Sequence, residues 1–364
     1  MKNLEKEIRS QPQVLRGLRG LNDEAIDKIL DRVEKDRPAF VYFAARGTSD
    51  HACIYAQYLF GIYLGMPCAL ATPSVVSRYG AELDLSRALV IGVSQSGKAA
   101  DVISVIERAK KCGAPTVALT NDPSSPLSEI ADYKLDCGAG PEHSIAATKT
   151  FTAQMYVLAT LCARWAQRFG KVPPESTGVS SAEELLAALD KLPDAVEKLL
   201  ETVPAQIEAI IPRYRYLENA FVLARGITYP IAYEGALKIL ETNRIKVSGY
   251  AISDFYHGPL AQVGAGTLVI VLAARGKLLG DASDMMLRIQ NLESTGVDIL
   301  AITDDDGIAD KWDLAIKIPA APGMDSISPF LFAITLQLIA LKLTDVKNID
   351  PDESKALKKV TITK

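Results

Sequence analysis

The chain has 364 residues, with 40 basic and 44 acidic side chains and a net charge of −4. This length suits two domains of ordinary size, and the balanced charge offers no broad positive field for nucleic acid. The five cysteines form no CxxC pair, and none of the three histidines has a zinc-ligand partner at a useful spacing. Neither a disulfide framework nor a metal site is therefore expected.

The amino-terminal residues 1–37 are predicted to form helices that lead into the first core. The segment from Met1 to Glu7 is too charged for a signal peptide, and we expect no apolar run of membrane-spanning length in the chain. These features predict a cytoplasmic protein with no membrane partner.

Residues 38–170 are predicted to form a first α/β unit. Short Val/Ile/Leu runs alternate there with helical patterns, which is typical of a parallel sheet with helices on both faces. The first strand leads into Gly47-Thr48-Ser49, where backbone N–H groups and two hydroxyls are presented together. Ligands of such sheets bind beyond the carboxyl ends of the strands.

The most informative turn is Ser94-Gln95-Ser96-Gly97-Lys98, which lies between the apolar run 88–93 and a helical pattern. A buried strand, a small hydroxyl-rich turn and a helix start offer free N–H groups and a positive dipole end to an anion. An ordinary strand-to-helix connection has the same composition, so the turn alone leaves both interpretations open. Together with Gly47-Thr48-Ser49 it would provide two adjacent donor clusters for one phosphate.

Residues 139–154 contain further polar candidates. Gly140-Pro141 breaks the preceding strand, and a helix can begin shortly afterwards. Glu142, Thr148 and Lys149 are candidates for contacts to a sugar or a partner. The alternative is that Thr148 and Lys149 belong to a solvated helix start.

A second copy of this framework follows a helical linker at residues 171–215. The second unit, residues 216–344, repeats the strand patterns of the first at a spacing of about 180 residues, as residues 40–47 and 220–226 do. Similarity over so long a period indicates a duplicated domain and not a solenoid. The copies differ in chemistry, because the Ser-Gln-Ser of the first becomes Ala273-Ala274-Arg275 in the second.

The second unit also contains a helix with an acid–base pattern. Pro230 suits the first helical turn, and Glu234, Lys238 and Glu241 follow on one stripe. A glutamate beside a lysine suits proton transfer next to a carbonyl or imine, whereas an exposed salt-bridge stripe would show the same spacing. His257, in the following loop, is the side-chain type that titrates nearest neutral pH, although a lone loop histidine is often incidental.

These motifs occur together, and in the same order, in a known family. The chain resembles the sugar-isomerase (SIS) domain family, and in particular the isomerase half of glucosamine-6-phosphate synthases, over nearly its whole length. The matching segments are Arg46-Gly47-Thr48-Ser49, Ser94-Gln95-Ser96-Gly97, Ala147-Thr148-Lys149, residues 229–238, Glu241, His257-Gly258-Pro259 and the Lys-Val-Thr of the tail.

The resemblance implies two tandem flavodoxin-like SIS domains, each a parallel sheet with helices on both faces. It also implies a homodimer that binds a phosphorylated amino sugar and needs no metal or cofactor. The residues implied to bind the sugar and its phosphate are Gly47, Thr48, Ser49, Ser94, Gln95, Ser96, Glu142, Ala146 and Ala147.

The resemblance further implies the catalytic roles. Glu241 moves a proton between C1 and C2, Lys238 positions the open chain, and His257 assists ring opening in the site of the neighbouring subunit. A lysine of the tail, residues 345–364, enters the site. Alignment by the Val-Thr pair favours Lys358, and alignment by the preceding leucine favours Lys359.

Departures from the synthase pattern bear on the reaction. In the synthases the motif Ser-Gln-Ser-Gly is followed by Glu-Thr, whereas here it is followed by Lys98-Ala99. The threonine hydroxyl expected near the phosphate is therefore missing. No cysteine nucleophile follows Met1, and too few residues precede the first unit for a glutaminase half. The sequences Ala-Gly-Pro-Glu at 139–142 and Ala-Ala-Thr-Lys at 146–149 instead resemble those of the stand-alone deaminase branch of the family.

We therefore expect an isomerising deaminase that converts glucosamine 6-phosphate and water to fructose 6-phosphate and ammonia. One alternative is a related phosphosugar isomerase or a fructosamine-6-phosphate deglycase. A phosphate-binding turn does not determine which group the sugar carries at C1 or C2. Another is a non-catalytic sugar-phosphate sensor. The presence of Glu241, Lys238 and His257 together argues against a sensor.

Overall fold

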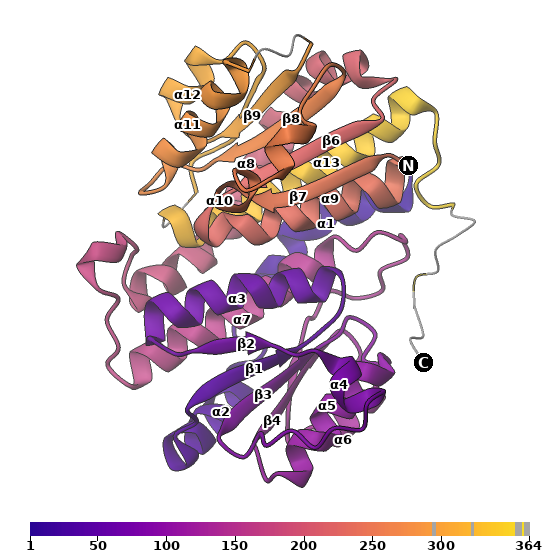
Figure 1. Ribbon diagram of the computed structural model, residues 1–364. Coiled ribbons are helices and arrows are strands. Elements are labelled where there is room, and N and C mark those ends of the chain that lie inside the picture. Colours follow the sequence, from indigo (N-terminus) through magenta and orange to yellow (C-terminus); the bar gives the residue numbers. More distant parts are fainter. Residues whose placement is uncertain (293–295, 322–323, 354–358, 360–364) are drawn as a thin grey trace.

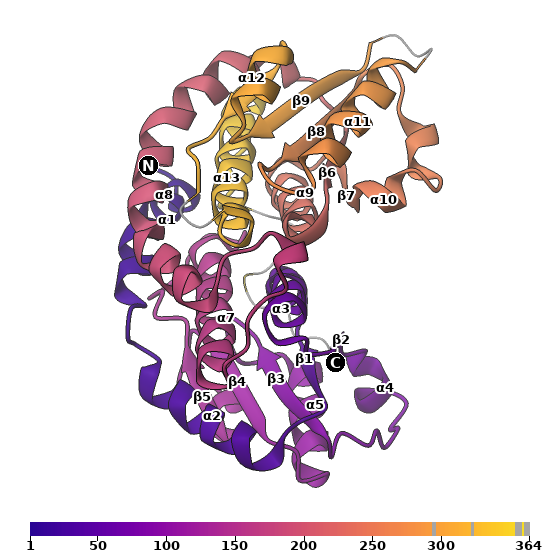
Figure 2. The same ribbon diagram turned by 90° about the vertical axis from the view of Figure 1, so that its left-hand side faces the viewer.

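The computed structural model describes residues 1–292, 296–321, 324–353 and 359. It contains two five-stranded sheets with a layer of long helices between them (Figures 1 and 2). Every pair of neighbouring strands is parallel. This is the predicted α/β fold.

The two sheets have the same strand order. In the first sheet the order is β2-β1-β3-β4-β5, and in the second it is β10-β9-β8-β6-β7. When the strands of each unit are numbered from its own first strand, both orders become 2-1-3-4-5, the flavodoxin-like order. The structure thus confirms the predicted tandem duplication. The strands are β1 Phe40–Ala44, β2 Cys68–Leu70, β3 Ala88–Val93, β4 Thr116–Thr120, β5 Tyr133–Asp136, β6 Asn219–Ala224, β7 Lys246–Ala251, β8 Thr267–Ala273, β9 Asp298–Thr303 and β10 Ala315–Lys317.

The helices fall into a shared middle layer and two outer layers (Figure 2). The middle layer contains α1 Asn3–Gly17, α3 Thr48–Leu64, α7 Lys149–Arg168, α8 Ala182–Ile210, α9 Tyr229–Asn243 and α13 Ser328–Lys347, while α2 Asp23–Asp36 packs against α7 and β5. The outer helices are α4 Pro73–Ser77, α5 Ala100–Lys111 and α6 Pro126–Ile130 on the first unit, and α10 Ile252–Phe255, α11 Leu279–Gln290 and α12 Asp306–Lys311 on the second. Short 3-10 helices are η1 Glu175–Thr177, η2 Ile211–Tyr214, η3 Gly226–Thr228, η4 Pro259–Gln262 and η5 Met324–Ser326.

The central strands β3, β4 and β8 are buried at every position because both faces of each sheet are covered there. On β3, Leu89, Ile91 and Val93 join the middle core, whereas Ala88 and Val90 pack in the outer core with residues of α5. One continuous middle core includes residues from both units. The two units are therefore joined by packed helices, and not only by the linker.

Helix α13 is the centre of this middle layer. It is 20 residues long and apolar enough to cross a membrane, but 83% of its apolar window is buried within the protein. It packs against α9, α8 and α1. The expectation that no apolar run reaches membrane-spanning length is wrong for this segment, because a helix buried on all sides has the same composition as a membrane span.

Candidate active site

The two predicted donor clusters follow neighbouring strands. β1 and β3 are paired in parallel, with Ala44 opposite Gly92. Thr48 is the first residue of α3, so the N–H groups of Thr48 and Ser49 have no partner within the helix and lie at the positive end of its dipole. The turn Ser94–Gly97 follows β3 at the same edge. This position, where the strand order reverses, is a usual ligand site in such sheets.

The Ser94–Gly97 turn is held by its own hydroxyls and by the adjacent loop. The N–H of Gly97 donates to the Ser94 hydroxyl at 3.2 Å, and that of Lys98 donates to the Ser96 hydroxyl at 3.3 Å. Gly97 has a φ of +61°, and a Cβ atom there would lie 2.0 Å from the Ser125 hydroxyl. Only glycine fits this close approach without a shift of the loop, which presets the shape of the turn.

The stripe on α9 is buried and not solvated. Glu234 and Lys238 have side chains exposed by 1% and 2%, and that of Glu241 is exposed by 20%. The Lys238 ammonium lies 2.7 Å from Glu241 Oε2 and 3.4 Å from Glu234 Oε1, and it donates to the Thr48 hydroxyl at 3.1 Å. The exposed-stripe interpretation is therefore wrong for this helix. Its acid–base groups face the amino-terminal end of α3 in the other unit.

Close packing of α9 brings these groups to that position. A Cβ atom on Gly235 would lie 2.3 Å from Leu336 of α13, and one on Gly249 of β7 would lie 2.5 Å from the Ala232 carbonyl oxygen. The two glycines let α9 sit tightly between α13 and β7.

Lys238 is held in its charged form. Burial alone would lower its pKa. The charges of Glu234 and Glu241, together with the hydrogen bond to Glu241, outweigh burial and raise the pKa of Lys238 above its ordinary value. The residue therefore acts as an ammonium and not as a free amine near neutral pH.

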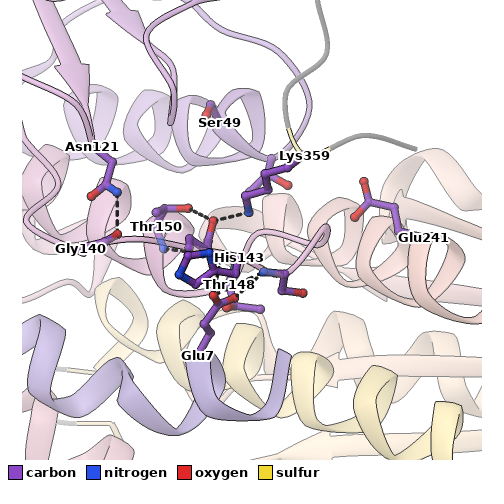
Figure 3. Close-up of polar contacts among 12 residues, drawn as sticks. Glu7, Ser49, Asn121, Gly140, His143, Thr148, Thr150, Glu241 and Lys359 are labelled. Carbon is purple, nitrogen blue, oxygen red and sulfur yellow. Dashed lines mark hydrogen bonds and ion pairs between the residues drawn. The ribbon is translucent and has the colours of Figure 1, made fainter. Parts of the chain in front are cut away.

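Glu142 and Lys359 form a second ion pair, and Figure 3 shows Lys359 beside Thr150. The Lys359 ammonium lies 2.7 Å from Glu142, whose side chain is fully buried and also accepts from the N–H groups of Thr148 and Thr150 and from the Thr150 hydroxyl. Burial alone would raise the pKa of Glu142, but Lys359 and these N–H groups outweigh it and lower the pKa. Glu142 also contributes to the raised pKa of Lys238, so the two pairs lie close enough to interact.

The structure describes Lys359 and not Lys358. Of the two lysines that the sequence offers for the site, Lys358 lies outside the described residues, and Lys359 reaches Glu142. Thr148 and Lys149, at the start of α7, are both buried. The interpretation of these two as a solvated helix start is therefore wrong, because α1 and α3 cover α7.

A cavity of about 270 Å³ opens beside this second pair. Ala146 is buried and Ala147 half-buried in the segment that leads into α7. The Ser49 hydroxyl accepts from the Gln154 side-chain amide at 3.1 Å, which leaves the hydroxyl proton of Ser49 available for donation. The residues that line the cavity are Gln95, Ser96, Lys98, Asn121, Asp122, Pro141, Glu142, His143 and Lys359.

His257 is not part of this cluster in the single chain. It is exposed in the loop after α10, and its backbone N–H donates to the Asp254 carbonyl. Among the residues that the structure describes, no group of three His, Cys, Asp or Glu side chains is arranged to hold a metal ion.

Two residues of the site, the buried Glu7 and the half-buried His51, were missed by the sequence analysis. Glu7 of α1 accepts from the backbone N–H groups of His143 and Ser144 beside Glu142, and its burial raises the pKa of its carboxyl group. His51 of α3 lies 2.7 Å from Glu234. Their partners are more than 130 residues away in the chain, so no local spacing pattern could have identified them.

Comparisons with known proteins agree with this architecture. A family model for the SIS domain matches residues 38–164 and 217–346. The glutamine–fructose-6-phosphate aminotransferase (isomerizing) of Aquifex aeolicus (strain VF5) is 32% identical over 366 residues, which cover 98% of this chain and 57% of that protein. The chain thus spans just over half the length of the curated relatives that it matches.

Two solved structures show the same fold. The C-terminal domain of glucosamine-fructose-6-phosphate aminotransferase from Francisella tularensis has a TM-score of 0.84 at 24% identity, covering 97% of this chain and 98% of that chain. Glucosamine-6-phosphate deaminase from Thermotoga maritima has a TM-score of 0.75 at 21% identity and full coverage of both chains.

Proposed function

The chain belongs to the SIS domain family, and from this premise we propose that it is an isomerising deaminase acting on glucosamine 6-phosphate. Its products would be fructose 6-phosphate and ammonia, and water would be the second substrate. The observation that carries the proposal is the Lys238–Glu241 ion pair, in which the buried Lys238 also contacts Thr48 beside the candidate phosphate turn. The proposed anion site and the proposed acid–base pair, which come from different units, would then lie side by side.

The phosphate would bind at the shared carboxyl edge of β1 and β3. The N–H groups at the start of α3 and the hydroxyls of Thr48, Ser49, Ser94 and Ser96 offer donors, and the Gln95 amide adds another. Backbone donors at Gly47 and in the segment 146–147 would complete the contacts to phosphate and sugar.

Glu241 would serve as the base. In the open-chain sugar it takes the proton from C2, which gives an enaminol, and returns the proton to C1, which gives a ketose imine. Water adds to C2 of the imine, and the amine leaves as ammonia. The Lys238 ammonium would stabilise the developing negative charge on the C1 oxygen, a role that its raised pKa supports.

The remaining assignments are part of the same proposal. Lys359 is the tail lysine that we place at the substrate, because it pairs with Glu142 at the cavity. His257 would assist ring opening in the site of a second subunit of a homodimer, since it is exposed in the single chain. We also propose a cytoplasmic location, which the five free cysteines support.

A panel of phosphosugars assayed for ammonia tests the proposal. We expect the chain to release ammonia and fructose 6-phosphate from glucosamine 6-phosphate in the absence of any amino donor or acceptor other than water. Turnover of fructosamine 6-phosphate alone would identify a deglycase. Binding of the sugar phosphates without turnover would identify a sensor and overturn the proposal.

Loss of the Ser96 hydroxyl is expected to weaken substrate binding. Ser96→Ala removes one donor that contacts the phosphate equally in the ground and transition states, so KM should rise by about tenfold with kcat nearly unchanged. Steady-state kinetics measure both constants. Thr202→Ala removes an exposed hydroxyl of α8 and is the matched control. An unchanged KM in Ser96→Ala would remove Ser96 from the phosphate site.

A further inference from the structure

Glu234 joins the two units at the proposed active site. One of its carboxylate oxygens accepts from the Thr48 hydroxyl at 3.2 Å and lies 3.4 Å from the Lys238 ammonium. The other lies 2.7 Å from Nδ1 of His51. The carboxylate is thus held by two residues of α3 and one of α9, although its side chain is almost fully buried.

The proposed proton transfer changes the charges around Lys238. Glu241 is negative before it takes the C2 proton and neutral while it holds that proton. During that interval Lys238 loses one of its two carboxylate partners, and Glu234 remains as the other. A buried ammonium needs a counter-charge to stay protonated. Glu234 is therefore the described carboxylate that remains beside Lys238 as its counter-charge during this interval.

His51 is placed to orient the carboxylate of Glu234 beside Lys238. A buried carboxylate is stabilised by the hydrogen bonds that it accepts, and Nδ1 of His51 makes the shortest described contact to Glu234. The His51 ring stacks on Tyr233 with centroids 5.7 Å apart and planes inclined by 13°. This stacking holds the plane of the imidazole and therefore keeps Nδ1 directed at Glu234.

We propose that His51 is a positioning residue for proton transfer, which acts on Lys238 and Glu241 through Glu234. The inference rests on the proposed function. His51 and Thr48 lie one turn apart on α3, so the same helix start that would bind the phosphate also holds the counter-charge of the acid–base pair. The phosphate site of the first unit and the acid–base pair of the second would therefore be held in a fixed relative position by α3.

Steady-state kinetics of ammonia release test this role with two substitutions. His51→Leu leaves Glu234 without its shortest hydrogen bond, so we expect kcat to fall by about 10- to 100-fold while KM changes by less than about threefold. His51→Asn places an amide N–H near the former Nδ1 position and should restore most of kcat. Lys342→Met, which breaks an ion pair with Glu208 away from the site, is the control and should match the wild type.

The possible results distinguish a failure of the His51 role from a failure of the proposed deaminase activity. If the wild type releases no ammonia from the phosphosugar panel, the proposed function fails, and this inference fails with it. If the wild type turns over and His51→Leu has the same kcat, the inference alone is overturned. An equal loss in His51→Asn and His51→Leu, with both variants folded by circular dichroism, would also overturn it. So would a rise in KM at constant kcat.

Discussion

Replacement of Glu241 by glutamine is expected to lower kcat for ammonia release by about 10²- to 10⁴-fold, the usual contribution of a general base. The amide can still accept a hydrogen bond from the Lys238 ammonium, which lies 2.7 Å from the carboxylate in the wild type. It cannot take the C2 proton. Shape and packing on α9 are therefore kept while the base is removed.

Two measurements distinguish this loss of chemistry from a loss of binding. Calorimetric titration with glucosamine 6-phosphate should give an affinity for Glu241→Gln close to that of the wild type. Exchange of the C2 proton with deuterated solvent should be lost together with turnover. Glu201→Gln, at an exposed position of α8, is the matched control. Undiminished turnover in Glu241→Gln would exclude Glu241 as the base.

Replacement of Lys238 by methionine is expected to destabilise the protein as well as inactivate it. Methionine has a similar length, but the change leaves Glu234 buried without its ammonium partner. Breaking a buried ion pair from one side typically costs about 3–5 kcal/mol of unfolding free energy. The midpoint of urea unfolding should therefore fall, and kcat should fall in whatever fraction of the protein remains folded.

A double variant separates the two effects. In Lys238→Met/Glu234→Gln the buried charge is removed together with its partner, so much of the lost stability should return. Turnover should not return, because the ammonium that stabilises the C1 oxygen is still missing. A double variant that recovers turnover would exclude Lys238 from the chemistry. A single variant as stable as the wild type would contradict the buried-pair interpretation.

The fold was readable from the sequence because its signals are local. A strand with both faces covered is apolar along its length, as β3 is. The repeat of these strands at a spacing of about 180 residues predicted two copies of one architecture. The order 2-1-3-4-5 in both sheets confirms that prediction.

Helix α13 shows where composition alone misleads. The segment of 20 residues has the hydropathy of a membrane span, and only its neighbours α8, α9 and α1 identify it as a core helix. The polar residues on one face of α9 are a second case in which the sequence pattern did not tell whether a face is buried. Spacing placed Glu234, Lys238 and Glu241 on one face but could not decide whether water or protein covers that face.

The sequence by itself determined the elements, the duplication and the motifs that line the edge of the first sheet. Each of these depends on residues that are neighbours in the chain or recur at a regular period. Only the tertiary structure decided that His51 pairs with Glu234, that Glu7 and Lys359 flank Glu142, and that α9 faces α3. Such pairings join residues more than 130 positions apart in the chain, and burial then shifts the pKa of a carboxyl group, as it raises that of Glu7. Proximity and burial of this kind arise from packing, which no local pattern encodes.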